Sequence, residues 1–521
     1  MPGTVVANVS LFTGITGGST SNCDAITDWG GTPTLDTETF VQGTGSLSKK
    51  VSSTTSIHVF TLASALDLSN TQLYVWAACG SISILATKAA GGFKIRVEDA
   101  AANWGEWYMA GKDTWTGAWD CFMVHTTTAF SANSATLPTM TAITKAGVVF
   151  YTTATVAKIN CWWDALRYGT GLAIKAGTEA SPATFQDFVD AENTVANKYG
   201  VITVAEGILQ VQGQVDFGST TAGEATYFKD TSKVLVFRDR SVPANFYRLL
   251  VQGNATATTK VYFGTKSGGA GISGCIFRSV GAAKYLLTAT DTNITNLGIY
   301  GCTFFDANTI SLPVVSGTNR EVLNTTFEVC AEVVVSSCIV ENCNLISADD
   351  EAVTLPSGNI HGLKNSTFIS NPNATRIPNT GTYTFDNLKF SGNTVDIDNT
   401  SGGLVTVNCV NGANPTTYTG NTVINNYVLV SITVKDEAQA NIVGASVRVS
   451  KLDDNSVQYM NELTGADGKA EESINYPGAV SLRIRARKST TGTRYIPLET
   501  TGAMLTTGFT LTVTLYQDGN L

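Results

Sequence analysis

The sequence predicts an all-β protein, and its composition, its alternating apolar runs and an internal repeat all support this fold class. Charged residues make up only 14% of the 521 residues, whereas an ordinary soluble domain has roughly 25%. Exposed helix faces normally need Lys, Glu and Arg, so the polar surface must come from Thr, Ser, Asn and Gly, which favour sheets and turns. The length allows about three domains, each with its own core.

Residues 1–172 are predicted to form an antiparallel sandwich. Short runs alternate apolar and polar residues, as in Gln72 to Trp76 and Phe93 to Val97, and Gly and Asn turns separate them. All eight Trp of the chain lie in this segment. The adjacent Trp162 and Trp163 would point to opposite faces of a strand, so one of them should lie outside the main core.

The opening of this segment resembles the first strands of concanavalin-like jelly rolls. The resemblance rests on Asn22-Cys23-Asp24 through Trp29 and on Gly43-Thr44-Gly45-Ser46-Leu47-Ser48. Exposed aromatic rings stack on sugars in carbohydrate-binding sandwiches, so a nearby aromatic cluster is a candidate glycan-binding site. Its members, beside Tyr108, are Trp104, Trp107, Trp115 and Trp119. Core packing is the competing interpretation, since a sandwich of this size needs large aromatic residues inside.

Residues 173–200 are predicted to be a linker that contains one amphipathic helix. Ser181 suits the N-cap, Pro182 suits the first helical position, and Gly200 would end the helix. The apolar residues with helical spacing are Phe185, Phe188, Val189, Val195, Ala196 and Tyr199. Such a helix could cover an exposed sheet end, which otherwise offers unpaired backbone groups to other chains. A plain linker helix is the alternative.

Residues 201–427 are predicted to form a right-handed parallel β-helix, because they contain an imperfect repeat. The seven copies begin at Gly274, Gly301, Asn324, Asn342, Asn365, Asn387 and Gly403. The six steps from Phe277 to Cys409 give a mean period of 22 residues, which suits one coil. At about 4.8 Å per coil, these copies and about three less regular coils between residues 201 and 270 would form a rod roughly 50 Å long.

The residue types of the repeat fit such coils. Gly and Asn readily enter the left-handed backbone conformation that a sharp corner needs. The second and fourth positions of each copy point the same way along a strand. They would fill the interior as Cys275/Phe277, Cys302/Phe304, Thr325/Phe327, Cys343/Leu345, Ser366/Phe368 and Leu388/Phe390. The large residues should therefore form one column, Lys389 should point outward, and the ten widely spaced Cys should be buried free thiols.

Residues 428–521 are predicted to form a small β-sandwich. Alternating runs extend from Val428 to Val434 and from Gly444 to Val449, and Asp467-Gly468 marks a turn. Further strands are expected at Ser481 to Arg487 and Thr510 to Leu515. This segment resembles immunoglobulin-like modules related to carboxypeptidase regulatory domains, which occur at the ends of many surface and phage proteins.

The sequence offers little material for metal or cofactor chemistry, and we expect neither. A net charge of −9 argues against nucleic-acid binding through a basic surface. The three His, at His58, His125 and His361, are expected to be surface or packing residues rather than parts of a metal site or hydrolytic triad. Gly268 to Gly271 precede a predicted strand rather than a helix, which argues against phosphate binding.

Glycan cleavage is the serious enzymatic option, because β-helices often carry paired carboxylates that act as acid and base. The candidates are Asp349, Asp350 and Glu351, which follow a predicted strand, and Asp396 with Asp398, which are expected to share one strand face. Alternate residues of a strand lie about 7 Å apart, within the range for inverting hydrolysis. Solvated turns are the competing interpretation.

A lyase would instead need an ordered cation and a basic residue. Arg320 with Glu321, or Arg376, could supply the basic group.

The architecture as a whole resembles structural proteins of tailed-bacteriophage particles, such as tailspikes, tail fibres and capsid decoration proteins. This resemblance implies a non-enzymatic homotrimer on the virion surface, attached to other virion proteins at one end and able to bind host-surface glycans. A tailspike depolymerase that acts on host polysaccharide is the alternative, and a bacterial surface adhesin is a third possibility. Residues 1–4 lack the start of a signal peptide, and no stretch of about 18 apolar residues is present. We therefore expect synthesis in the host cytoplasm and no membrane insertion.

Overall fold

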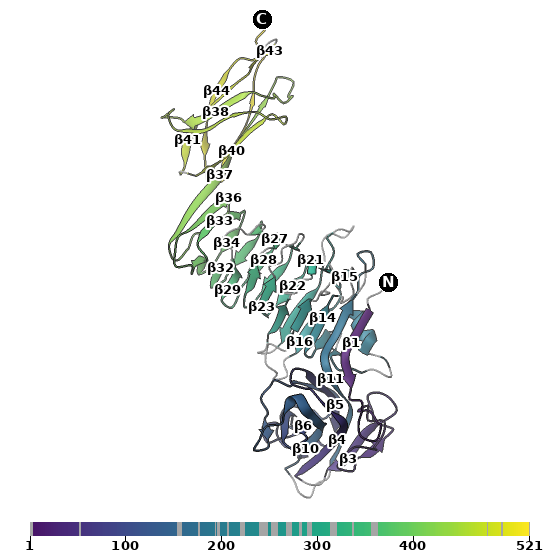
Figure 1. Cartoon of the computed structure of the whole chain (residues 1–521). Coiled ribbons are helices and arrows are strands. Elements are labelled where there is room, and N and C mark those ends of the chain that lie inside the picture. Colours follow the sequence, from purple (N-terminus) through teal and green to yellow (C-terminus); the bar gives the residue numbers. More distant parts are fainter. Residues whose placement is uncertain are drawn as a thin grey trace. The chain divides into compact units, whose positions relative to one another are not determined.

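A computed structural model confirms the predicted all-β class, which the many strands of Figure 1 display. The residues that the structure describes include one short α-helix. The structure describes residues 4–51, 54–153, 159–175, 178–192, 194, 198–205, 208–218, 225–238, 248–251, 259–266, 274–280, 284–288, 294–312, 320–335, 338–355, 363–476, 478–490 and 493–519. The chain divides into two compact units, residues 1–321 with 328–331 and residues 322–327 with 332–521. Within the described ranges, no helix has the length and apolarity needed to cross a membrane.

The first unit begins with an antiparallel sandwich of two sheets. One sheet contains β1 (Thr4–Leu11), β2 (Thr34–Asp36), β3 (Ser46–Val51), β5 (Gln72–Cys79), β8 (Asp120–His125) and β11 (Ile159–Lys175). The other has the order β4 (Thr55–Leu66), β10 (Ile143–Tyr151), β6 (Phe93–Asp99), β7 (Trp104–Ala110) and β9 (Ala132–Asn133). Two short 3-10 turns, Ile82–Ile84 and Met140–Ala142, connect strands.

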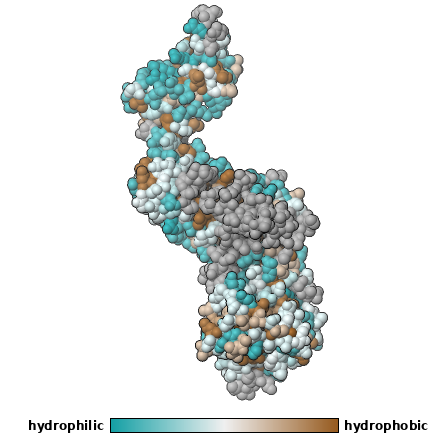
Figure 2. Space-filling view, viewed as in Figure 1, coloured by the Kyte–Doolittle hydropathy of each residue, from teal (hydrophilic) through white to brown (hydrophobic). Residues whose placement is uncertain are grey.

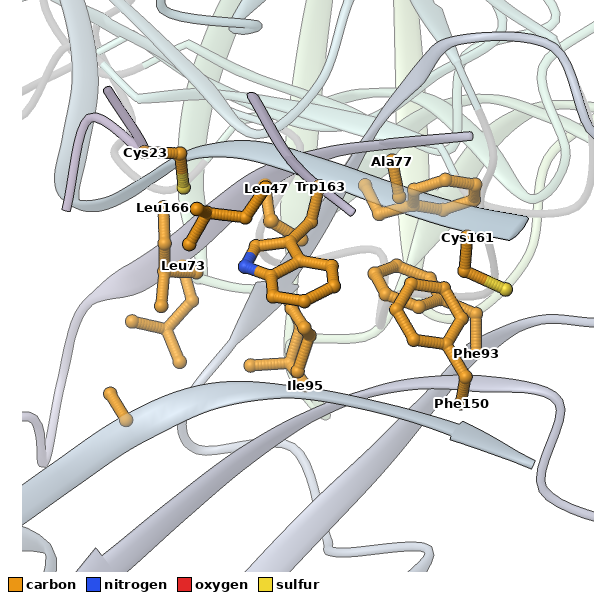
Figure 3. Packing of buried hydrophobic residues seen from close by; sticks show 14 of the residues in the cluster. Cys23, Leu47, Leu73, Ala77, Phe93, Ile95, Phe150, Cys161, Trp163 and Leu166 are labelled. Atoms are coloured by element: carbon orange, nitrogen blue, oxygen red, sulfur yellow. The ribbon is translucent and has the colours of Figure 1, made fainter. Parts of the chain in front are cut away.

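Trp163 lies at the centre of the sandwich core. Figure 3 shows it between side chains of both sheets, including Leu47 and Ile95. The ring of His58 stacks on it with centroids 4.5 Å apart, so this His is a packing residue as predicted. The neighbouring Trp162 is only half-buried, and its Nε1 donates a hydrogen bond of 2.8 Å to Asp36. The two Trp therefore do point to opposite faces of β11.

Strand β11 belongs to both the sandwich and the first coil of the β-helix. Its first half pairs antiparallel with β3 and β5, whereas Leu172, Ala173 and Ile174 pair parallel with β14 (Gln214–Phe217). In Figure 1 this strand extends continuously from beside β5 to beside β1 and β14. The backbone hydrogen bonds thus continue across residue 172, where the sequence places a boundary.

The helix is shorter than predicted. Helix α1 extends over Phe185–Glu192, and its N-cap is Thr184 rather than Ser181. Thr184 Oγ1 accepts from the Gln186 N–H at 3.2 Å, and Asp187 accepts from the Thr184 N–H at 2.7 Å, which together form a capping box. The helix ends at Glu192, whose carboxylate accepts hydrogen bonds from the backbone N–H groups of Gly200 and Ile202. Tyr199 is therefore not helical, and Val195 and Ala196 lie outside the described residues.

Helix α1 covers one end of the coils, as predicted. Phe185 and Phe188 are fully buried. The Phe185 ring lies 4.9 Å from Phe228, and the Phe188 ring lies 6.0 Å from Phe217, both in the first coil. The apolar face of the helix thus closes the interior of the solenoid.

The coils of the first unit each contribute one strand to each of three parallel sheets. The first sheet has β13 (Ile208–Val211), β16 (Val234–Arg238), β19 (Ile276–Val280) and β22 (Thr303–Phe305), with β12 (Ile202–Ala205) antiparallel at its edge. The second has β14, β17 (Arg248–Val251), β20 (Tyr285–Thr288) and β23 (Ala307–Leu312). The third has β15 (Ala225–Phe228), β18 (Thr259–Phe263) and β21 (Ile294–Tyr300). Described strands of two coils, not three, lie between residues 201 and 270.

The second unit continues the same three-strand plan. Its first sheet has β25 (Thr326–Glu328), β28 (Asn344–Ile346), β31 (Thr367–Ile369) and β34 (Lys389–Ser391). Its second has β26 (Val333–Val335), β29 (Glu351–Thr354), β32 (Asn373–Ile377) and β35 (Val395–Asn399). Its third has β27 (Ile339–Glu341), β30 (Leu363–Lys364), β33 (Gly381–Asp386), β36 (Val405–Val410) and β37 (Thr422–Lys435). Strand β24 (Arg320–Leu323) follows β23 and precedes β25 in the sequence.

The predicted column of large side chains is present within each unit. In the first unit Phe277 lies opposite Phe304, and their rings stack 5.3 Å apart. In the second unit Phe368 lies opposite Phe390, with rings 5.0 Å apart. The small partners are also buried, as predicted: Cys275, Cys302, Thr325, Cys343, Ser366 and Leu388.

The corners also confirm the repeat and add a second position to it. Asn324, Asn342, Asn365 and Asn387 have φ between 49° and 55°, in the left-handed region. A second left-handed residue follows five positions later in each of these copies, at Val329, Ser347, Ser370 and Gly392. Sequence analysis missed this second corner because its residue type varies and even includes a β-branched Val, which rarely adopts this conformation.

The seventh copy of the repeat is wrongly aligned. Cys409 lies in β36 opposite Phe385, so it belongs to the third sheet and not to the column of Phe390. The chain passes from β35 directly into β36, with no strand of the first sheet between them. All ten Cys are nevertheless buried free thiols, as predicted.

The C-terminal sandwich starts from the last strand of the coils. Strand β37 first pairs parallel with β36, and from Tyr427 onward it pairs antiparallel with β40 and parallel with β45 (Figure 1). The other strands are β38 (Ser446–Lys451), β39 (Gln458–Leu463), β40 (Lys469–Asn475), β41 (Val480–Arg487), β42 (Ser489–Thr490), β43 (Thr493–Arg494), β44 (Leu498–Met504) and β45 (Phe509–Thr514). Figure 2 shows mostly hydrophilic residues on the visible face of this sandwich, with apolar residues scattered among them.

Candidate functional site

The second sheet of the N-terminal sandwich presents charged side chains on the face opposite its core. Alternation along β6 places Phe93, Ile95 and Val97 in the core. Lys94, Arg96 and Glu98 therefore point to the other face. The cross-strand neighbours of Arg96 and Lys94 on β7 are Glu106 and Tyr108.

These charges form a continuous chain of ion pairs in which positive and negative groups alternate. Lys94 Nζ lies 2.8 Å from Glu106 Oε2, and Arg96 Nη1 lies 2.8 Å from Glu106 Oε1. Arg96 Nε then lies 2.8 Å from Glu98 Oε1, and Lys145 Nζ lies 2.9 Å from Glu98 Oε2. Each of the four carboxylate oxygens thus contacts a cationic nitrogen, and Arg96 bridges the two carboxylates. We call these five residues the charge chain.

The middle of the charge chain is shielded from solvent, whereas one end is open. The side chains of Glu106 and Glu98 are 4% and 9% exposed, but that of Lys145 is 36% exposed. Burial by itself raises the pKa of Glu98, yet the hydrogen bonds from Lys145 and Arg96 outweigh it and hold the pKa below its usual value. Glu98 is consequently a fixed anion at neutral pH.

Aromatic rings border the charge chain. The Arg96 guanidinium lies 4.3 Å from the centroid of the Trp104 ring. The Lys94 ammonium lies 4.9 Å from the Tyr108 ring and 5.7 Å from the Tyr151 ring. All three rings are half-buried, so part of each remains accessible. Charged donors and acceptors held between partly exposed rings are the groups that recognise the hydroxyls and apolar faces of sugars.

The four predicted Trp do not form one cluster on this face. Trp107 and Trp115 belong to the core, and their indole N–H groups donate to the carbonyls of Thr128 and Ala118. Trp104 lies on the charged face, and Trp119 is half-buried outside β7. Sequence analysis missed the charge chain, although the alternation Lys94-Ile95-Arg96-Val97-Glu98 already places three charges on one face of a strand.

A second group of charged residues lies on the coils of the second unit. Glu351, which begins β29, is 5% exposed and forms an ion pair with Arg376 of β32. Burial raises the pKa of Glu351, a hydrogen bond with Asp350 raises it further, and Arg376 opposes the change. Asp398 lies opposite Arg376 on β35. The structure thus brings Glu351 and Asp398 to one arginine, on which Glu332 also acts, and Asp350 is bonded to Glu351. Asp349 is exposed in the preceding bend.

Asp396 serves the local structure of its coil. It is 3% exposed and accepts hydrogen bonds from the backbone N–H groups of Thr416 and Thr417, at 2.7 and 3.1 Å. Asn393 donates a further bond of 3.0 Å. Asp398, by contrast, accepts from Thr419 Oγ1 at 2.6 Å and is more exposed.

The remaining predicted groups show no metal site in the part of the chain that the structure describes. No cluster of three or more His, Cys, Asp or Glu side chains occurs there. Burial lowers the pKa of His58 to about 4, so this imidazole is neutral at physiological pH. His125 is buried near Thr127. His361 and Gly268 to Gly271 lie outside the described residues, as does the side chain of Arg320.

No protein-family model matches the chain, and no curated protein matches it. Similar solved structures include an exo-β-agarase, with 10% identity and a TM-score of 0.19, aligned over 32% of this chain and 22% of the agarase. A family 30 carbohydrate-binding module of a cellulosomal cellulase from Clostridium thermocellum aligns over 32% of this chain and 96% of the module, with 16% identity and a TM-score of 0.20.

The catalytic domain of a GH87 α-1,3-glucanase, solved with tetrasaccharides, aligns over 85% of this chain and 78% of that chain. Its identity is 11% and its TM-score is 0.25. These neighbours are carbohydrate-active or carbohydrate-binding proteins, and their similarity to this chain is remote.

Proposed function

We propose that the protein binds glycans through the charge chain and its bordering rings, as a non-enzymatic structural protein on the exterior of a phage particle. The observation that carries the glycan-binding role is the chain from Lys94 to Lys145 with Trp104, Tyr108 and Tyr151 around it. Ion pairs already fix these donor and acceptor side chains, so they lose little conformational entropy when a sugar binds.

The energetic cost of the charge chain supports a binding role. Taking charged groups out of water costs several kcal/mol per ion, and apolar residues of similar size often stabilise a protein equally well or better. Stability alone therefore does not explain five charges on this sheet. The three cations exceed the two carboxylates by one, so the face favours neutral or acidic sugars over amino sugars.

Affinity electrophoresis in gels that contain candidate polysaccharides tests this function. Capsular polysaccharide, lipopolysaccharide O-chains and neutral glucans would be compared, and at least one should retard the wild-type protein. Trp104→Ala and Tyr151→Ala should each weaken the binding at least about fivefold, since a stacked aromatic ring contributes about 1–3 kcal/mol to ligand binding. Tyr418→Ala removes a ring that is 52% exposed on the second unit and serves as the matched control. Equal retardation of all variants would contradict the proposal.

The position on a virion and the homotrimeric state are parts of the same proposal. They are supported by the solenoid architecture. Helix α1 covers one end of the coils, whereas the flat faces of the three parallel sheets remain available for contact with other subunits. Light scattering coupled to gel filtration should give three times the mass of the chain. A monomer at micromolar concentration would contradict the trimer, and immunogold labelling of intact particles would test the virion position.

Glycan cleavage is a second candidate, favoured by the raised pKa of Glu351 beside Arg376. A carboxyl group with a raised pKa keeps its proton to a higher pH, as a general acid requires. Incubation with host polysaccharide would then release oligosaccharides, and Glu351→Gln would abolish the release. Glu341→Gln, a change at a carboxylate of the coils that pairs with Lys364 instead of Arg376, would not. Polysaccharide of unchanged size after incubation would exclude this activity for the substrate tested.

A further inference from the structure

Two cysteines face each other across strands β5 and β11 of the N-terminal sandwich. Cys79 is the last residue of β5, and the strand register places it directly opposite Cys161 of β11. The Sγ atom of Cys161 donates a hydrogen bond of 3.9 Å to the Sγ atom of Cys79. These two residues, which we call the cysteine pair, are thus in contact although their positions differ by 82 in the sequence.

The backbone around the cysteine pair has the spacing that a disulfide needs. The Gly80 N–H donates to the Asn160 carbonyl at 2.8 Å, whereas the Cys79 N–H points away from β11 and donates to the Gly117 carbonyl at 2.8 Å. The cysteine pair is therefore a non-hydrogen-bonded pair of the antiparallel ladder, in which opposite Cα atoms lie about 4.5 Å apart. Disulfides join Cα atoms that are about 4.4–6.8 Å apart. Rotation of the two side chains is therefore sufficient to bring the sulfur atoms together.

The two thiols of the pair differ in access and in acidity. Cys161 is fully buried, whereas Cys79 is 5% exposed, so a small oxidant reaches Cys79 first. The hydrogen bond from Cys161 lowers the pKa of Cys79, and a bond with the backbone of Ser81 acts in the same direction. Burial raises the pKa of Cys161. Because the thiolate is the reactive form of cysteine, Cys79 is the sulfur that reacts first and Cys161 is the thiol that follows.

A second pair of neighbouring cysteines, in the coils, provides an internal reference. The Cys275 N–H donates to the Sγ atom of Cys302 at 3.4 Å, and both residues are 1% exposed. Their Sγ atoms donate to the backbone carbonyls of Phe228 and Tyr300. Burial raises the pKa of Cys275 well above its usual value. Proximity alone is therefore present in both places, whereas an accessible thiol of lowered pKa is present only in the cysteine pair among these four residues.

We propose that the cysteine pair is an oxidation site, at which a peroxide converts the two thiols into a disulfide between β5 and β11. The Cys79 thiolate attacks one oxygen of hydrogen peroxide, the O–O bond breaks, and Cys79 becomes a sulfenic acid. The hydroxide that leaves takes up the proton that Cys79 had lost. The Cys161 sulfur then attacks the Cys79 sulfur, the S–O bond breaks, and water leaves with the Cys161 proton. Two thiols are thereby oxidised, and one peroxide is reduced to two water molecules.

The disulfide would tie together the two ends of the segment that carries the charge chain. Strands β6, β7 and β10 all lie between Cys79 and Cys161 in the sequence. A disulfide restricts the unfolded chain, and this stabilising effect grows with the length of the closed loop. Thiols stay reduced in a cytoplasm and oxidise outside cells. That the oxidation follows release from a host cell rests on the proposed function, whereas the chemistry of the cysteine pair does not.

Peptide mapping of the full chain after treatment with hydrogen peroxide tests the proposal. The treated protein would be alkylated in acidic urea, which slows thiol–disulfide exchange, and then digested with trypsin. Cleavage after Lys and Arg leaves Cys79 in the peptide 51–88 and Cys161 in the peptide 159–167, each without another Cys. These two peptides should be joined after treatment of the folded protein and should separate in dithiothreitol. Cys275 and Cys302 should remain alkylated.

Variants and unfolding measurements complete the test. Cys79→Ala and Cys161→Ala should each abolish the joined peptides, whereas Cys121→Ala, a change at a buried thiol of the neighbouring strand β8, should retain them. The treated wild-type protein should unfold at a urea concentration roughly 1 M higher than the reduced protein, as followed by Trp fluorescence. This difference should be absent in Cys161→Ala. The peptide map of the wild-type protein decides the proposal even if a variant folds poorly.

Three results would overturn the proposal. These are separate alkylated peptides after treatment of the folded wild-type protein, sulfinic acid at Cys79 without a link to Cys161, and joined peptides only in protein that was unfolded in urea before treatment. An unchanged or lower urea midpoint of the linked protein would overturn its stabilising effect. None of these measurements involves a polysaccharide, so a failure here is distinct from a failure of the proposed glycan binding.

Discussion

The sandwich and the coils of the first unit build their surface clusters by different means. In the sandwich, the charge chain combines alternate residues of strand β6 with their cross-strand neighbours on β7 and β10. In the coils, the rings of Tyr227, Tyr262 and Tyr300 form a stack that we call the tyrosine ladder, which repeats one residue type at nearly the same position of successive coils. The first mechanism combines unlike side chains into a mixed network, whereas the second stacks like on like.

The interiors differ in the same way. Trp163, Phe150 and His58 of the sandwich pack around one another at varied angles. The coil interior instead contains flat stacks between successive coils, such as Phe277 on Phe304, inclined by 11°, beside edge-to-face pairs such as Phe217 with Phe263. A substituted side chain in the sandwich core contacts neighbours of several shapes, which can repack around it. A substituted side chain in the column of the coils contacts the equivalent residues of the coils above and below. The following changes test this difference, in order of expected effect.

Phe327→Asp should have the largest effect. Phe327 is 2% exposed in the coil interior of the second unit. A carboxylate there has no cationic partner among the repeat's inward positions, and burying an unpaired charge costs several kcal/mol. The variant should not yield soluble folded protein, as measured by expression and gel filtration. Lys389→Ala, an exposed position of the same repeat, is the control and should behave like the wild type. A soluble, heat-resistant Phe327→Asp protein would refute the inward register.

Arg96→Leu should have the next largest effect, because it breaks the middle of the charge chain. Glu98 and Glu106 would each lose a buried partner, which typically costs about 3–5 kcal/mol. Lys145→Ala removes the exposed end of the chain and should cost less than about 1 kcal/mol. Because all eight Trp lie before residue 164, Trp fluorescence during urea unfolding reports on this region alone. Equal effects of the two changes would mean that the network contributes no more than surface pairs.

Asp164→Asn should stabilise the protein at alkaline pH, with an effect of a few kcal/mol. Asp164 lies in β11, which the sandwich and the first coil share, and burial raises its pKa to about 7, with Asp24 adding to the shift. Its Oδ2 accepts from the N–H groups of Val41 and Gln42, at 2.9 and 3.0 Å. Because the folded pKa exceeds the unfolded value of about 3.9, the stability that this group contributes is complete below about pH 4 and is lost as the pH rises through 7.

Urea unfolding at pH 5 and pH 8 measures this difference. The gain from Asp164→Asn should be up to about 4 kcal/mol at pH 8 and distinctly smaller at pH 5. Burial also raises the pKa of Glu192 to about 7, so this group likewise loses its stabilising contribution as the pH rises through 7. Part of the pH dependence will therefore remain in the variant. His58 acts in the opposite direction below about pH 6.5, but it contributes equally to both proteins. If the variant were less stable than the wild type at pH 8, ionisation of Asp164 in the folded protein would cost little free energy, and the prediction would be wrong.

The sequence predicted the solenoid well because a repeat is a local signal. Asn324, Asn342, Asn365 and Asn387 each mark a corner, and the alternating small and large residues after them fix the interior. The same method failed for Cys409, since a residue type alone does not reveal to which of three sheets a strand belongs.

The charge chain was harder to predict than the repeat. Lys94, Arg96 and Glu98 follow from alternation along one strand, but Glu106 and Lys145 join them only through the register of β7 and β10. Likewise, Tyr227, Tyr262 and Tyr300 have no common spacing, because Tyr300 reaches the ladder from two residues beyond its register partner. Sequence periodicity carries no information on such an offset.

Gly298→Ala should have a smaller effect than Phe327→Asp, Arg96→Leu and Asp164→Asn, and it tests whether the glycine holds Tyr300 beside Tyr262. The added methyl group would collide with the Tyr300 ring, and such overpacking typically costs about 1–3 kcal/mol. In a Tyr300→Ala background these nearest atoms are absent, so the same change should cost much less. A double-mutant cycle from thermal unfolding should therefore give a coupling of at least about 1 kcal/mol. If Gly298→Ala costs the same in both backgrounds, the glycine acts through the backbone, and the stacked position of Tyr300 would not depend on it.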